Sequence, residues 1–168
     1  MIRSVMLSTI FLVVCDFVQS TWLGGIAIFG VVPDISLVVL IWVSYKNGLV
    51  EGPAAGFLSG LVEDFLSASP LGFHAFVKTT VATLMALLHG SFFIDRLVLP
   101  ILFGIAGTLA KAIAAFALHL VFGSVIHVYA ILERTLWIEA AYNGLIAPIV
   151  FLALTPLSRF LVTERGRG

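Results

Sequence analysis

The feature that most constrains this chain is a succession of long apolar stretches separated only by short polar breaks. A helix that crosses a hydrocarbon core about 30 Å thick needs roughly 20 mostly apolar residues. About six stretches approach that length, which predicts an all-α integral membrane protein, a compact bundle in one domain over residues 1–168. We expect transmembrane helices at 5–22, 26–45, 49–66, 73–88, 97–122 and 135–155, followed by a cytoplasmic tail at 156–168.

Composition supports a membrane location and argues against other classes. Hydrophobic residues make up 61% of the chain and charged residues only 11%, whereas a soluble domain has about a quarter charged residues. The formal net charge of zero speaks against a surface for nucleic acid. Cys15 is the only cysteine, so neither an intrachain disulfide nor a cysteine-based metal site can form.

The first two stretches each need an interpretation. In the first, no small-residue cleavage site follows the apolar run from Val5 to Val14, and Asp16 interrupts the end of that run, so we expect a retained helix and not a removed signal peptide. The second stays open between two forms, a straight helix capped by Asp34 and a broken, re-entrant helix that begins as early as Ile26. Gly24, Gly25, Gly30 and Pro33 break the apolar pattern between the first stretch and Asp34.

The distribution of basic residues indicates the orientation. With the N-terminus in the cytoplasm, the outer loops hold only Arg134, whereas the inner segments hold six basic residues. An even number of helices then places both termini in the cytoplasm. The six inner residues are Arg3, Lys46, Arg96, Arg159, Arg165 and Arg167.

Charged residues inside or near the ends of the expected helices need partners, because each costs about 2.5–3.5 kcal/mol at the bilayer centre. We expect most of them in the outer half of the membrane, with Lys78 paired to Asp64 or Glu63 and Asp16 paired to Lys111. Two interpretations stay open, structural ion pairs that hold the helices in register and a polar cavity, open outward, that binds a ligand. The candidate residues are Asp16, Glu63, Asp64, Lys78 and Lys111.

A stripe of glycines opens the third stretch. Gly48, Gly52, Gly56 and Gly60 recur every four residues, and small residues at this spacing let helix backbones approach closely in lipid. The stripe therefore predicts either packing inside the protein or docking of a partner's single helix. In the second case, Gly56→Leu or Gly60→Leu would weaken partner binding and leave insertion intact.

No pattern in the sequence points to catalysis. The chain has no H-E-x-x-H, G-x-S-x-G or Walker-type glycine loop, and its four histidines lack metal-ligand spacing. Glu63 and Asp64 are neighbours, so on a helix they point about 100° apart and do not converge on one bond. We therefore expect no enzyme, no cofactor and no metal.

One central segment resembles a known family. Residues 60–75 read G-L-V-E-D-F-L-S-A-S-P-L-G-F-H-A and are similar to the bacterial rod shape-determining protein MreD, whose pattern is approximately G-L-x-x-D-x-x-x-x-x-P-L-G-x-x-A. Pro33-Asp34 at a helix start, and Tyr142-Asn143 followed by Pro148, also look like that family. The family pattern does not include Glu63 before the aspartate, nor the charged Lys78 and Lys111 inside helices.

The resemblance implies a non-enzymatic scaffold of the cell-elongation machinery in the bacterial cytoplasmic (inner) membrane. Such a protein would bind MreC, help to organise or regulate peptidoglycan synthesis, and share an assembly with MreB, a SEDS glycosyltransferase and a class B penicillin-binding transpeptidase. The fold would be similar to the substrate-binding subunits of energy-coupling-factor transporters. Outer loop contacts would come from Pro33 and Asp34 and from Pro70, Leu71 and Gly72.

The alternative is a substrate-capture subunit of a vitamin or cofactor transporter. It requires an outward pocket lined by aromatic and polar groups. The residues that could supply these groups are Asp16, Trp22, Lys111, Trp137 and Tyr142.

Overall fold

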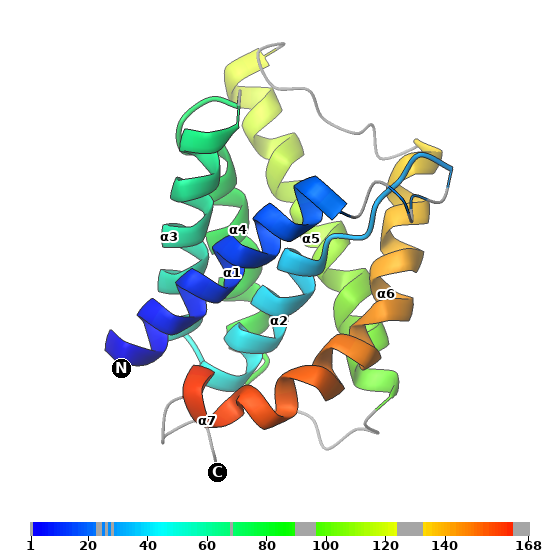
Figure 1. Ribbon diagram of the computed structural model, residues 1–168. Coiled ribbons are helices and arrows are strands. Elements are labelled where there is room, and N and C mark those ends of the chain that lie inside the picture. Colours follow the sequence, from blue (N-terminus) through cyan, green and yellow to red (C-terminus); the bar gives the residue numbers. More distant parts are fainter. Residues whose placement is uncertain are drawn as a thin grey trace.

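The chain folds into a bundle of helices, as the apolar stretches predict. The computed structural model describes residues 2–22, 25, 27, 29–67, 69–89, 97–123 and 133–162. Within this part of the chain the long helices are α1 (Ile2–Trp22), α2 (Ile35–Asn47), α3 (Glu51–Leu66), α4 (Phe73–Leu87), α5 (Val98–Phe122) and α6 (Arg134–Leu154) (Figure 1). A short 3₁₀ turn (Thr155–Leu157) and α7 (Ser158–Leu161) continue from α6. The all-α class is confirmed.

The helices differ in whether they can cross a membrane unaided. Three of the described helical segments are long and apolar enough, namely Ile2–Thr21, Val98–Phe122 and Arg134–Leu161. The apolar helix α2 has 13 residues and α4 has 15. At 1.5 Å per residue these helices reach about 20 and 22 Å, short of a hydrocarbon core of about 30 Å. The protein is therefore a membrane protein in which three described helices are long enough to span a bilayer alone and the shorter apolar helices α2 and α4 are not.

The second helix begins later than its expected bound at residue 26. Residues 29–34 are not helical, and α2 starts at Ile35, where the Asp34 side chain accepts a hydrogen bond from the Leu37 N–H at 2.9 Å. Gly30 has a φ of +80° and Pro33 restricts the residue before it to extended backbone, so a helix cannot run through this segment. Residues 26 and 28 lie outside the described part of the chain.

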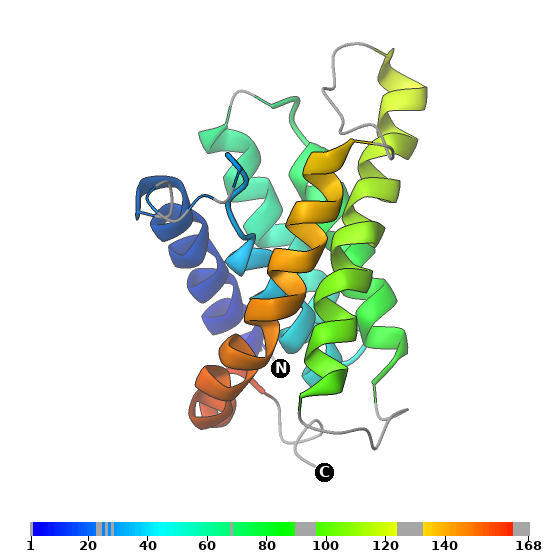
Figure 2. The same ribbon diagram turned by 90° about the vertical axis from the view of Figure 1, so that its right-hand side faces the viewer.

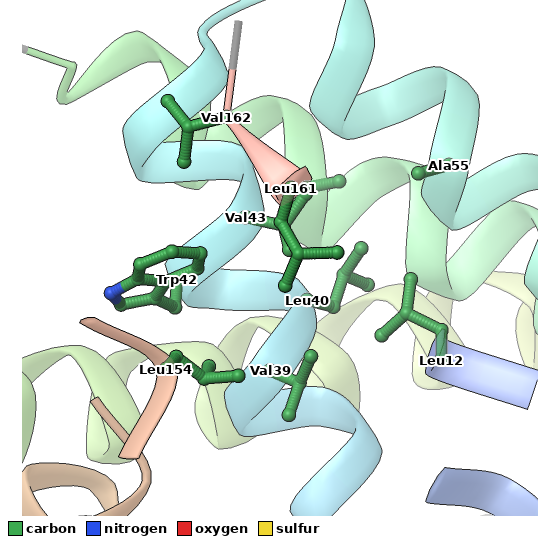
Figure 3. Close-up of a cluster of buried hydrophobic side chains, with 10 residues drawn as sticks. Leu12, Val39, Leu40, Trp42, Val43, Ala55, Leu154, Leu161 and Val162 are labelled. Carbon is green, nitrogen blue, oxygen red and sulfur yellow. The ribbon is translucent and has the colours of Figure 1, made fainter. Parts of the chain in front are cut away.

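Helix α2 forms the centre of the bundle and contacts α1, α3, α4, α5 and α6. Ten of its residues are buried, as expected for a helix that is apolar on every side. Figure 3 shows its side chains meeting residues from α1, α3 and the C-terminal segment in one cluster. That cluster contains Leu12, Val39, Leu40, Trp42, Val43, Ala55, Ala82, Leu154, Leu161 and Val162.

The other helices are arranged around α2 in two close pairs and one oblique helix. Helices α3 and α4 form one pair and α5 and α6 the other, and Figure 2 shows α5 and α6 side by side. Helix α1 crosses the front of the bundle obliquely (Figure 1). The carbonyl of Leu161 accepts hydrogen bonds from Ser4 Oγ at 2.6 Å and Asn47 Nδ2 at 3.0 Å. Both ends of the described chain therefore lie on the same side of the bundle.

The glycine stripe lies against this protein's own helices. A Cβ at Gly52 would come within 2.5 Å of Ser44 on α2, and one at Gly60 within 2.6 Å of Ala75 on α4. Gly56 faces the α4 backbone, while Gly48 is not on α3 at all but ends α2 with a φ of +78°. Gly52, Gly56 and Gly60 thus serve close packing of α3 on α2 and α4, which is the first of the two interpretations that the sequence left open. A leucine at Gly56 or Gly60 would disturb the fold itself.

Candidate functional site

Two lysines inside helices form the centres of two charge clusters near the start of α2. Lys111 lies 13 residues after the first residue of α5, and α2 itself is 13 residues long. At 1.5 Å per residue, Lys111 and the start of α2 both lie about 20 Å from the end of the bundle at which α5 begins and α2 ends. The Lys111 cluster and the start of α2, which also holds Ser36 of the Lys78 cluster, thus lie at about the same level of the bundle. That this level is the outer half of a membrane stays a prediction.

The Lys78 cluster joins α1, α2, α3 and α4. Lys78 Nζ lies 2.8 Å from Asp16 Oδ2 and 2.8 Å from Glu63 Oε2. The same ammonium donates a hydrogen bond to Ser36 Oγ at 3.2 Å. Glu63 is one of the two partners expected for Lys78, whereas the expected pairing of Asp16 with Lys111 is wrong. The oblique course of α1 brings Asp16 to α4 and away from α5.

Asp64 does not form the ion pair with Lys78 that its position suggested. Its carboxylate accepts hydrogen bonds from the backbone N–H groups of Gly72 (2.9 Å), His74 (2.8 Å) and Ala75 (3.2 Å) at the start of α4. His74 Nδ1 lies 2.9 Å from Asp64 Oδ1. Gly72 is the N-cap residue of α4 and has no side chain to cap it, so Asp64 supplies the cap from α3.

This cap explains the segment on which the family resemblance rests. Gly60 lets α3 approach the Ala75 backbone, Asp64 caps α4, and Gly72 takes the left-handed φ of +92° that turns the chain into α4. Pro70 precedes this turn, and its carbonyl accepts the Phe73 N–H at 3.1 Å. The segment therefore fixes the geometry of the turn between α3 and α4.

The Lys111 cluster joins the start of α2 to α5 and α6. Lys111 Nζ lies 2.7 Å from Asp34 Oδ2 and 2.7 Å from Glu139 Oε1. The Asp34 N–H donates to Asn143 Oδ1 at 2.8 Å, and Asn143 Nδ2 donates to Thr108 Oγ1 at 2.9 Å. Non-helical backbone at membrane depth needs such internal partners, because lipid offers none.

These contacts correct one expectation and add one residue. Pro33 and Asp34 were expected as outer loop contacts, yet Pro33 is fully buried and Asp34 turns inward to Lys111. Glu139, which was not among the candidate residues, is buried and contacts Lys111. The signal that could have identified Glu139 is the rule that a lysine inside a membrane helix needs a carboxylate.

Each cluster borders an open pocket, and a third pocket lies at the α3–α4 turn. The pocket beside Lys111 has a volume of about 290 Å³ and includes Gln19, Val32, Asp34, Lys111, Thr135 and Glu139. The groove beside Lys78 has a volume of about 300 Å³ and includes Val13, Asp16, Phe17, Val62, Glu63 and Leu66. The third, about 340 Å³, is lined by Pro70, Leu71, Gly72, Phe73, Phe76, Leu118 and Phe122.

The residues expected to line one capture pocket do not meet in a single pocket. Lys111 lines the pocket on its side of the bundle and Asp16 lines the groove beside Lys78. Trp137 is 55% exposed, and the side chain of Trp22 is not part of what the structure describes. Within the described ranges, no group of three or more His, Cys, Asp or Glu side chains could hold a metal ion.

Comparison with known proteins adds one finding. A family model described as rod shape-determining protein MreD matches residues 2–156 of the 168. The match includes all six long helices, both lysine clusters and the hairpin segment. Neither the curated proteins nor the solved structures gave a match.

Proposed function

Since this chain belongs to the MreD family and its role is in determining rod shape, we propose that it is a non-enzymatic membrane scaffold of the cell-elongation machinery. In this role it binds MreC and helps to organise or regulate peptidoglycan synthesis. MreB, a SEDS glycosyltransferase and a class B penicillin-binding transpeptidase belong to the same assembly. The observation that carries the proposal is the family match over residues 2–156.

The proposed contact with MreC is the pocket at the α3–α4 turn. Leu71 is 69% exposed there, and the aromatic rings of Phe73 and Phe76 line the pocket beside it. The turn is held in place because Asp64 accepts the Gly72 N–H. A preformed apolar surface loses little conformational freedom on binding, which favours protein contacts.

The proposed location is the bacterial cytoplasmic membrane, with both termini in the cytoplasm. Arg3, Lys46 and Arg159 lie at the end of the bundle where the described chain begins and ends, whereas Arg134 starts α6 at the opposite end. Basic residues concentrate on the cytoplasmic side of membrane proteins. This orientation turns the pocket at the α3–α4 turn outward, toward the extracytoplasmic part of a single-span partner.

The test is recovery of MreC with the protein after mild detergent extraction. We expect Leu71→Glu to lower MreC recovery by about tenfold, since a charge replaces an apolar contact at a protein interface. Phe29→Glu is the matched control, because Phe29 is also an exposed apolar residue of the outer region, 77% accessible, and lies outside the pocket. Equal recovery with both variants would remove this pocket from the interface.

One observation favours the second candidate, a substrate-capture subunit of a transporter. The pocket beside Lys111 presents an ammonium group, two carboxylates and the Gln19 and Thr135 side chains in a volume of about 290 Å³. Native mass spectrometry of the purified protein distinguishes the candidates. A bound small molecule together with ATPase subunits would replace the scaffold proposal, whereas recovery of MreC without them would support it.

A further inference from the structure

We infer that the groove between the outer ends of α1 and α3 receives the transmembrane helix of a partner protein that carries a lysine or arginine in its outer third. The groove lies beside Lys78, on a different surface from the pocket at the α3–α4 turn. The inference goes beyond the proposed function, because it does not depend on which protein supplies the helix.

The shape of the groove follows from the course of α1. Helix α1 crosses the bundle obliquely, so its outer end diverges from the outer end of α3 (Figure 1). Val13 and Phe17 form the α1 wall, and Val62 and Leu66 form the α3 wall. From Val13 to Ser20 the groove extends about 10 Å along α1 at 1.5 Å per residue. The walls are apolar and therefore suit the aliphatic stem of a basic side chain.

The base of the groove carries an excess of negative charge. Asp16 and Glu63 both line it, and Lys78 lies within 2.8 Å of both carboxylates. His74 Nε2 lies 3.5 Å from Glu63 Oε1, but its Nδ1 is already engaged with Asp64. Asp64 does not line the groove and is held by backbone N–H groups of α4, so the groove itself has two carboxylates against the single ammonium of Lys78.

A second observation points to a missing partner at the same place. Ser67, at the outer end of the groove, has a buried Oγ without a hydrogen-bond partner among the described residues. A covered hydroxyl with no partner is unfavourable, since desolvation is not compensated by a hydrogen bond. An ammonium or guanidinium group that enters the groove could complement both this hydroxyl and the carboxylates.

The lipid-facing side of α1 argues for a helix as the occupant. Below the groove, Ile2, Met6, Ile10 and Val14 are each at least half exposed and recur every four residues. Side chains at this spacing form a ridge on one face of a helix, into which a neighbouring helix packs. The ridge continues into the groove at Phe17, so one partner helix can contact the ridge and place its basic side chain between α1 and α3.

The experiment measures association of the full-length protein with synthetic single-span helices in nanodiscs without amine lipids. Three leucine–alanine peptides of about 22 residues carry Lys, Leu or Glu at the same position in the outer third. Energy transfer between dyes on the protein and the peptide reports binding. We expect the Lys peptide to bind about tenfold more tightly than the Leu peptide, and the Glu peptide to bind most weakly.

Variants then locate the effect. Glu63→Gln or Asp16→Asn is expected to remove the advantage of the Lys peptide, whereas Glu139→Gln, the matched neutralisation in the other cluster, is expected to keep it. Equal binding of the Lys and Leu peptides to the unmodified protein would overturn the inference without requiring any variant to fold. Loss of the Lys advantage when phosphatidylethanolamine is added would assign the groove to a lipid amine and also overturn it. Failure to recover MreC from cells, with the Lys advantage intact, would count against the proposed function alone.

Discussion

The Lys78 and Lys111 clusters have the same ionic composition but different surroundings. In each, one lysine contacts two carboxylates at 2.7–2.8 Å. The two aspartates are equally enclosed, with Asp34 at 17% and Asp16 at 18% side-chain exposure, but Glu139 of the Lys111 cluster is at 5% and Glu63 of the Lys78 cluster at 28%. Asp34 is the one of these four carboxylates that attaches non-helical backbone to helices.

Asp34 shows why this difference matters. It caps α2, accepts the Lys111 ammonium and donates its own N–H to Asn143. The Lys111 cluster thus holds in place the point at which the chain turns into the central helix. The Lys78 cluster connects helices that also pack through apolar contacts, and it leaves two carboxylates facing a groove. We therefore expect the Lys111 cluster to serve stability and the Lys78 cluster to be available for binding.

The largest expected effect is that of Lys111→Met. Removal of the ammonium leaves Asp34 and Glu139 without their shared cation inside the bundle, and such a loss typically costs about 3–5 kcal/mol. We expect the free energy of unfolding in detergent to fall by that amount. Lys111→Arg keeps the charge and serves as the control. A Lys111→Met protein as stable as the unmodified one would end the assignment of this cluster to stability.

A smaller loss is expected for Lys78→Met. Glu63 keeps partial access to the groove, so its desolvation is less complete than that of Glu139 in the Lys111 cluster. We expect a loss of about 2 kcal/mol in the same unfolding measurement. Adding Glu63→Gln to Lys78→Met removes one of the two unpaired carboxylates and is expected to restore part of the stability. A loss equal to that of Lys111→Met would mean that the two clusters do not differ in role.

The packing of the α3–α4 hairpin gives the third prediction. A Cβ at Gly60 would lie 2.6 Å from backbone atoms of Ala75, and backbone cannot move aside as a flexible side chain can. We expect Gly60→Ala to cost about 2 kcal/mol of stability through overpacking. Gly25→Ala is a control, because a Cβ there would meet nothing within 4 Å. Normal stability with reduced partner recovery would return the stripe to the role of a partner interface.

The helices could be predicted from the sequence much better than the ion pairs. Apolar stretches define α3 to α6 closely, because lipid requires them. The start of α2 after Asp34 was one of two forms that the sequence left open. The sequence could not decide between them, since the extended segment before α2 is stabilised by Asn143 and Lys111, which are distant in sequence. The position of a charged residue along its helix gives its depth in the bundle, but it does not give the direction in which the side chain points. For this reason Asp16 was assigned to Lys111 although it faces Lys78.

Asp64 provides the smallest and most specific test of the comparison, because it lies next to the Lys78 cluster without belonging to it. Its carboxylate accepts three backbone N–H groups of α4, so Asp64→Ala is expected to destabilise through loss of a helix cap, at about 1–2 kcal/mol. Asp64→Asn retains an acceptor oxygen and is expected to lose less. A partner of Lys78 would behave differently, because its removal would be offset by Lys78→Met in the double variant. Additive losses in Asp64→Ala with Lys78→Met would establish that capping and the lysine cluster act independently, whereas rescue would place Asp64 in the cluster.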